Sequence, residues 1–195
     1  MSVEIDLESV KKWKEESIKV AKEMNLFSDD IINDLKTVEI QLLPEPLPED
    51  GNIIFGHAEG SGFYLDKSSN QLVFQKPKVC VYHKNHSSSF DEFFNLLKKK
   101  GVYSSKLDRM VRNCFTEKDL FEIYNQSGMD HELLGHIGSW LSGKKGDERD
   151  ACIAQYQTAG YRGRESKKWE YATKFIPLFQ EKHRKISPTE YKTII

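Results

Sequence analysis

The chain has 195 residues, of which 38% are apolar and 30% are charged, a size and balance typical of one folded domain. Its 29 Lys and Arg residues nearly cancel its 30 Asp and Glu residues, so no overall electric field favours nucleic acid as a partner. No window reaches the roughly 18 consecutive apolar residues of a membrane span, and the first residues do not resemble a secretion signal. We therefore expect neither membrane association nor export.

Cysteine usage fits the same expectation. The three cysteines, Cys80, Cys114 and Cys152, are odd in number and lack CxxC spacing. They indicate neither a disulfide framework nor a zinc finger of the cysteine type. A reducing, cytoplasmic location fits them best.

Two helices are predicted at the start of the chain. Apolar residues recur every three or four positions from residue 7 to about 26, which is typical of an amphipathic helix. A second, short helix is expected after the cap residue Ser28, with Asp29 and Asp30 in its first turn, where acidic groups favour the helix dipole.

Short apolar runs follow between residues 38 and 82, separated by Pro, Gly, Ser and Asn. They predict a small mixed sheet of three to five strands, at residues 38–42, 53–55, 63–65, 72–74 and 79–82. A strand beside a protease cleft commonly holds its substrate by edge pairing, and residues 62–65 are the candidate for this role. The alternative is an ordinary hairpin strand.

Further helices are predicted over residues 90–97 and 107–114, and from a cap at Thr116. The polar run at residues 125–128 predicts a break or bend. Metal binding is not expected at the loop residues His83 and His86, nor at the isolated His57 and His183, because such side chains are usually solvated.

The most informative stretch is His131-Glu132-Leu133-Leu134-Gly135-His136. In the common motif H-E-x-x-H, two His four residues apart share one helix face and bind zinc, and the Glu is the general base. Here the spacing is five, which on a regular helix turns the second His about 140° away from the first. A one-residue π-type bulge at Leu134-Gly135 would bring the two imidazoles back together.

This hexapeptide resembles the H-E-x-x-G-H signature of the dipeptidyl peptidase III family of zinc peptidases. The resemblance covers six residues and implies that His131 and His136 bind Zn²⁺ and that Glu132 is the catalytic base. The order of helices, small sheet, His-bearing helix and Glu-bearing helix is similar to that of minimal gluzincins, in which a terminal segment can block the cleft. Residues 177–195 would be that segment here, or else a packing helix and a loose end.

A catalytic zinc takes three protein ligands, so a third is expected downstream. The predicted helix from Asp147 places Glu148 on its less polar side with Ala151 and Cys152. This segment resembles the E-E-C-R-A-E signature of dipeptidyl peptidase III and the E-x-x-A-D pattern of other gluzincins, and both alignments select Glu148 as the ligand. Cys152 stands where those families have an acidic residue that orients a ligating His. Asp150 or Asp130 could replace that residue.

Candidate proton donors are Tyr156 and Tyr161, because Tyr or His usually has this role in such sites. Arg162 and Arg164 could bind a substrate carboxylate. The alternative for all four is a structural role on a late helix.

The sequence thus predicts an α+β protein with one zincin-like catalytic domain over residues 1–195. The leading hypothesis is a zinc-dependent metallopeptidase acting on a peptide or protein substrate. The second is a catalytically inactive metal-binding or interaction protein with the same fold. In the third, the two His only face solvent or satisfy hydrogen bonds in the core.

Overall fold

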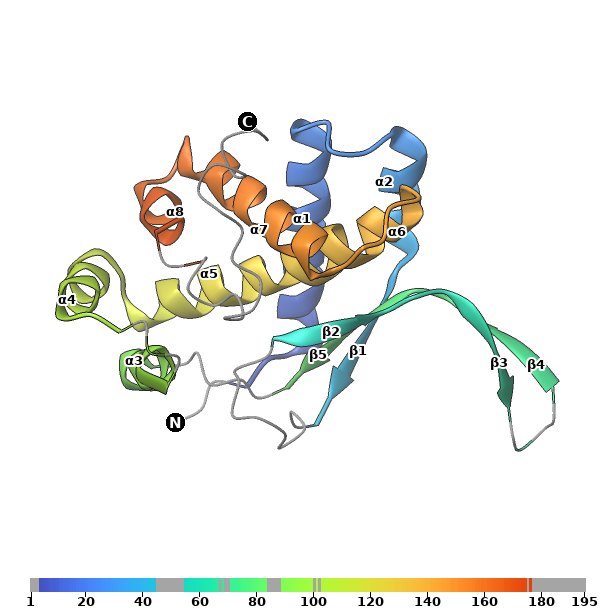
Figure 1. The fold of residues 1–195 in the computed structure, drawn as a ribbon, viewed down its shortest axis with the longest axis horizontal. Helices are drawn as coiled ribbons and strands as arrows, with labels where there is room; N and C mark the ends of the chain where they lie inside the picture. The colour runs from blue at the N-terminus through green and yellow to red at the C-terminus, as the bar shows by residue number, and fades with distance from the viewer. Residues whose placement is uncertain are drawn as a thin grey trace.

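The computed structural model describes residues 4–44, 55–66, 68, 71–83, 89–99, 101, 103–174 and 176. The fold is α+β, as predicted, with a layer of helices packed on one side of a small mixed sheet (Figure 1). Within the described ranges, no helix combines the length and the apolar character that a membrane crossing needs. The predicted strand at residues 53–54, His86, His183 and the segment 177–195 lie outside the described residues.

The first two helices are α1 (Leu7–Glu23) and α2 (Asp29–Thr37). The carboxylate of Asp6 caps α1 by accepting a hydrogen bond from the backbone N–H of Ser9 at 2.7 Å. Ser28 is the N-cap residue of α2, as predicted, although its side chain makes no capping hydrogen bond. The acidic first turn of α2 stabilises that helix start instead.

Three strands form the central sheet, in the order β1 (Glu39–Leu43), β5 (Lys78–Tyr82) and β2 (Gly56–Glu59). Strand β5 is parallel to β1 and antiparallel to β2. Because β2 is the last strand in this order, it is an edge strand. Strands β3 (Gly62–Asp66) and β4 (Gln71–Gln75) form a separate antiparallel pair that extends away from the helices (Figure 1). The candidate edge strand at residues 62–65 is therefore in this hairpin, and β2 is the strand that contacts the His-bearing helix.

The second half of the chain is helical, with α3 (Phe90–Lys99), α4 (Ser105–Cys114) and α5 (Glu117–Met129). Thr116 and Asp119 form a reciprocal capping box at the start of α5. After the motif come α6 (Ser139–Leu141), α7 (Glu148–Gly163) and α8 (Lys167–Ala172).

The predicted break at residues 125–128 is wrong, because α5 runs through it to Met129 and continues directly into the motif helix. The polar side chains there are buried and find partners within the fold. The side-chain amide of Asn125 donates to the carbonyl of Phe121 at 2.8 Å, and that of Gln126 donates to the carbonyl of Trp13 at 3.0 Å. Buried polar groups with such partners do not destabilise a helix interior.

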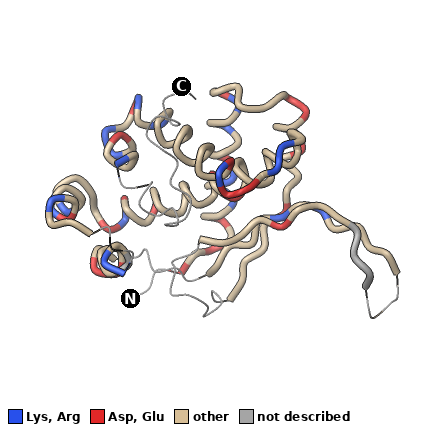
Figure 2. The backbone as a smooth tube through the Cα atoms, viewed as in Figure 1, with Lys and Arg blue, Asp and Glu red and all other residues tan. Residues whose placement is uncertain are grey.

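Two large apolar clusters hold the described part of the chain together. The first lies between the sheet, α1 and the motif helix, and includes Val10, Trp13, Phe55, Val79, Val81, Met129, Leu133 and Leu134. The second joins α3, α4, α5 and the end of α7, and includes Phe93, Leu97, Val111, Leu120 and Ala159. Basic and acidic residues are mixed along the helices that enclose these clusters (Figure 2).

Candidate metal centre

The motif forms a π-helix, η1 (Asp130–Gly138), rather than an α-helix with a single bulged turn. In a π-helix each hydrogen bond spans five residues, so side chains five apart lie on the same face. The imidazole rings of His131 and His136 are accordingly 5.0 Å apart between centroids. The prediction that the backbone compensates for the extra residue is confirmed, and the π-helical region is longer than predicted.

Three side chains converge on the exposed side of η1. One ligand atom from each of His131, His136 and Glu148 lies within 4.8 Å of the other two. The carboxylate oxygens of Glu148 are 3.3 Å from Nε2 of His131 and 3.6 Å from Nε2 of His136. A tetrahedral zinc ion with bonds near 2.0–2.1 Å holds its donor atoms roughly 3.3 Å apart. The two separations that involve Glu148 therefore fit one zinc ion.

The orientation of His136 is set by its other ring nitrogen. Its Nδ1 lies 2.7 Å from the carbonyl oxygen of Gly146, to which it donates a hydrogen bond. This places the lone pair on Nε2, which faces Glu148. The backbone N–H of Gly146 in turn donates to the carboxylate of Asp150 at 3.0 Å.

Asp150 therefore supports His136 indirectly, because Gly146 lies between them and is hydrogen-bonded to both. Asp130, the other predicted replacement, has different partners. Its buried carboxylate pairs with the guanidinium of Arg162 and accepts hydrogen bonds from the hydroxyls of Ser17, at 2.6 Å, and Thr158, at 2.8 Å. It ties η1 to α1 and α7 instead of orienting a ligand.

His131 is held by α7. Its side chain is hydrogen-bonded to those of Cys152 and Gln155, two residues on the buried side of that helix. Burial by itself lowers the pKa of His131, but these hydrogen bonds and the charge of Glu132 raise it above its usual value. Cys152 thus contacts His131 directly.

Close packing of η1 against α7 brings Glu148 to the two His. The helices are antiparallel: Gly135 faces Ala151, and Asp130 faces Thr158 further along. A Cβ on Gly135 would lie 2.2 Å from the Cα of Ala151. Only a residue without a side chain allows this approach.

Glu132 lies on the inner side of the cluster. Its carboxylate is 3.9 Å from Nε2 of His136 and accepts a hydrogen bond from the backbone N–H of Ala58 in β2. Burial raises the pKa of Glu132 to about 7, against the opposing effects of His131 and this N–H. Only 10% of its side chain is exposed, compared with 43% for Glu148.

The register of the sheet explains why Ala58 reaches Glu132. The N–H of Tyr82 donates to the carbonyl of Phe55, and along an antiparallel strand only every second residue pairs with the same neighbour. Ala58 is three residues after Phe55, so its backbone groups point away from β5. The edge of β2 thus faces η1. Neither β2 nor this hydrogen bond was predicted, because His57-Ala58-Glu59 contains no apolar run that signals a strand.

The two candidate tyrosines lie further along α7 than Glu148. Tyr156 and Tyr161 follow Glu148 by eight and thirteen residues, which is about 12 Å and 20 Å along the axis of α7 at 1.5 Å per residue. Tyr156 packs against Cys152, and Tyr161 is hydrogen-bonded to Glu23 of α1. Tyr161 is thus tied to α1, and Tyr156 lies beside Cys152, the residue that contacts His131.

The arginines proposed for a substrate carboxylate are also engaged elsewhere. Arg162 is buried against Asp130 and stacks over the ring of Trp169 at 4.9 Å. Arg164 stacks over Tyr161 at 5.4 Å. The buried pair of Arg162 with Asp130 is structural, which corrects the substrate-binding expectation for Arg162, whereas the expectation for the exposed Arg164 stays a prediction.

The fold and site together define an α+β protein with a candidate metal centre made of two His, one Glu ligand and a neighbouring buried Glu. No protein-family model matches the chain, and neither a curated protein nor a solved structure matches it. Its function must therefore be argued from the site.

Proposed function

We propose that this chain is a zinc-dependent metallopeptidase. The observation that carries the proposal is the convergence of His131, His136 and Glu148 beside the buried carboxylate of Glu132. The donor set of two imidazoles and one carboxylate is typical of catalytic zinc sites, which keep one position open. Zinc in such a site acts as a Lewis acid and lowers the pKa of a coordinated water.

The chain's own residues supply the other parts of the reaction. Glu132 is the general base: its carboxylate faces the donor cluster, and the N–H of Ala58 fixes its orientation. A bound cation would lower the pKa of Glu132 below the value that burial gives it, and the carboxylate could then accept a proton at neutral pH.

The edge of β2 is suited to an extended peptide. Its backbone groups at Ala58 point away from β5 and toward η1, next to the donor cluster. Because Glu132 accepts from the N–H of Ala58, an extended chain would pair with this edge through the carbonyl of Ala58, and it would then lie across the site next to the donor atoms. The substrate class we propose is therefore a peptide or an unfolded protein segment.

The test compares metal binding with hydrolysis. Glu132→Gln should retain bound metal, whereas His136→Ala should lose it. In Glu132→Gln, cleavage of a mixed peptide library, measured by mass spectrometry, should fall at least about 100-fold. Glu8→Gln, an exposed change on α1, is the matched control and should keep full activity. Full activity of Glu132→Gln, or unchanged zinc content in His136→Ala, would contradict the proposal.

A second candidate is a metal-binding protein without turnover. The observation that favours it is the position of Tyr161, which is hydrogen-bonded to Glu23 of α1 and follows Glu148 by about 20 Å along α7. In that case wild type would bind zinc through His131, His136 and Glu148 and cleave no peptide in the library.

A further inference from the structure

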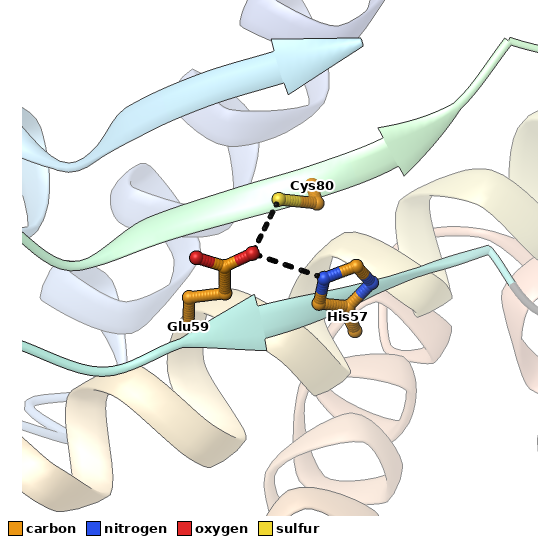
Figure 3. Close-up of side chains that lie close together, drawn as sticks. All are labelled: His57, Glu59 and Cys80. Atoms are coloured by element: carbon orange, nitrogen blue, oxygen red, sulfur yellow. Dashed lines mark hydrogen bonds and ion pairs between the residues drawn. The ribbon is translucent and has the colours of Figure 1, made fainter. Parts of the chain in front are cut away.

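A second group of metal-ligating side chains lies on the central sheet, outside the site described above. His57 and Glu59 are on β2, two residues apart, and therefore on the same face. Cys80 on β5 is the register partner of His57. Figure 3 shows these three side chains pointing toward one another, and one ligand atom from each lies within 4.8 Å of the other two.

The distances match those of a shared cation. Oε1 of Glu59 is 3.3 Å from Nε2 of His57 and 3.5 Å from Sγ of Cys80. A tetrahedral zinc ion with a sulfur ligand near 2.3 Å and an oxygen ligand near 2.0 Å holds those two atoms roughly 3.5 Å apart. The geometry thus requires little movement to admit an ion.

The remaining polar atoms of Glu59 and His57 are held by neighbours. Oε2 of Glu59 accepts hydrogen bonds from Gln75, at 2.5 Å, and Lys78, at 3.0 Å, which leaves Oε1 directed at the cluster. The hydroxyl of Tyr82 lies 3.4 Å from Nδ1 of His57, which leaves Nε2 directed at the cluster. Outer contacts of this kind orient the ligands of metal sites.

A nucleophilic role for Cys80 fits less well. The side chain is 1% exposed, and burial together with the charge of Glu59 raises the pKa of its thiol to about 11. Reactive cysteines are partly exposed and have a lowered pKa. His57 and Glu59, in contrast, are partly exposed, so an ion could enter from their side.

We propose that His57, Glu59 and Cys80 form a second divalent-metal site, selective for thiophilic ions such as Zn²⁺, that joins β2 to β5. Its donor set of nitrogen, oxygen and sulfur suits zinc, which accepts all three. The ion stabilises the edge strand whose backbone N–H at Ala58 contacts Glu132. The site is independent of the His131 cluster and of the function proposed for it.

Cobalt absorption spectra separate the two sites, because only a sulfur ligand gives a thiolate-to-cobalt charge-transfer band in the near ultraviolet. Co²⁺ added to metal-free wild-type protein should produce this band. Cys80→Ala should abolish it and lower the bound cobalt by one ion per chain. His57→Ala, a change at a half-exposed position, should also lower the bound cobalt by one ion, and it serves as a second variant if Cys80→Ala fails to fold.

Two further variants locate the sulfur ligand. Cys152→Ser, next to His131, and Cys114→Ser, outside both clusters, should keep the band. His131→Ala should also keep the charge-transfer band, and Zn²⁺ should still raise the melting temperature of this variant. The second metal site can therefore be tested even if the proposed peptidase function is wrong. Absence of the band in wild type, its persistence in Cys80→Ala, or its loss in Cys152→Ser would overturn the proposal.

Discussion

Nδ1 of His136 donates a hydrogen bond to the carbonyl oxygen of Gly146 across 2.7 Å. This one contact links the motif helix to the turn that leads into α7 and decides which ring nitrogen of His136 faces Glu148. The turn therefore acts on the candidate metal centre without supplying a ligand.

Loss of the carboxylate that supports this turn should weaken metal binding. In Asp150→Ala, the N–H of Gly146 loses its acceptor and the carbonyl that orients His136 becomes less fixed. Affinity for zinc should fall about 10- to 100-fold, the usual effect of removing an outer contact of a ligand. Competition with a chromophoric chelator measures it, in a His57→Ala background that removes the second cluster. Asp34→Ala, exposed on α2, is the control, and equal affinity in the two variants would refute the role of Asp150.

A side chain at Gly135 should force η1 and α7 apart. In Gly135→Ala, the new Cβ would meet the Cα of Ala151 at 2.2 Å, and the backbone of α7 cannot shift as a side chain would. We expect a loss of about 1–3 kcal/mol in the free energy of unfolding and weaker zinc binding, because Glu148 moves away from the two His. Urea denaturation and zinc titration measure the two effects.

The matched control for that change is Gly160→Ala on the neighbouring helix, α7. A Cβ at Gly160 meets nothing within 4 Å, and alanine favours helix more than glycine does. This variant should be as stable as wild type or more stable, by up to about 1 kcal/mol. Equal losses in the two variants would show that close packing at Gly135 is not the cause.

The buried pair of Asp130 and Arg162 should be one of the most sensitive positions of the fold. Asp130 is fully buried and its carboxylate binds the guanidinium group through both oxygens. Arg162→Met leaves that carboxylate without its cation, and removing one partner of a buried pair costs about 3–5 kcal/mol. Lys19→Ala, which removes an exposed pair with Glu16 at 3.8 Å, should change stability by less than about 1 kcal/mol. Denaturant midpoints test both, and similar values would contradict the prediction.

Stability should fall in acid partly through the capping box of α5. Burial alone would raise the pKa of Asp119, but hydrogen bonds from Lys168 and Thr116 lower it from 3.8 to about 2. The folded state therefore favours the ionised carboxylate. Its contribution, about 1–2 kcal/mol, is present above pH 4 and is lost as the pH falls toward 2.

The comparison that isolates this effect is wild type against Asp119→Asn over that pH range. The stability difference between the two proteins should shrink as the pH falls from about 4 to 2, because protonated Asp119 no longer gains from the ion pair. A difference that stays constant with pH would assign the stabilisation to neutral hydrogen bonds alone.

The sequence by itself determined the local features of this protein. Periodic apolar residues and caps predicted most helices and strands, for example the cap at Thr116 and the strand at β5. The spacing in His131-Glu132-Leu133-Leu134-Gly135-His136 required a departure from α-helix if the two His were to meet, and Glu148 followed from the need for a third ligand. These are short-range constraints, which a single chain segment carries.

Only the tertiary structure decided which distant residues meet. The polar run at residues 125–128 stays helical because Trp13 supplies an acceptor from α1, and no local pattern contains that information. Residues on β2 were missed for the same reason: His57 looks isolated until the register with β5 brings Cys80 opposite it. Strand pairing and the close contact of Gly135 with Ala151 depend on long-range packing, and packing rather than local propensity places both candidate metal clusters.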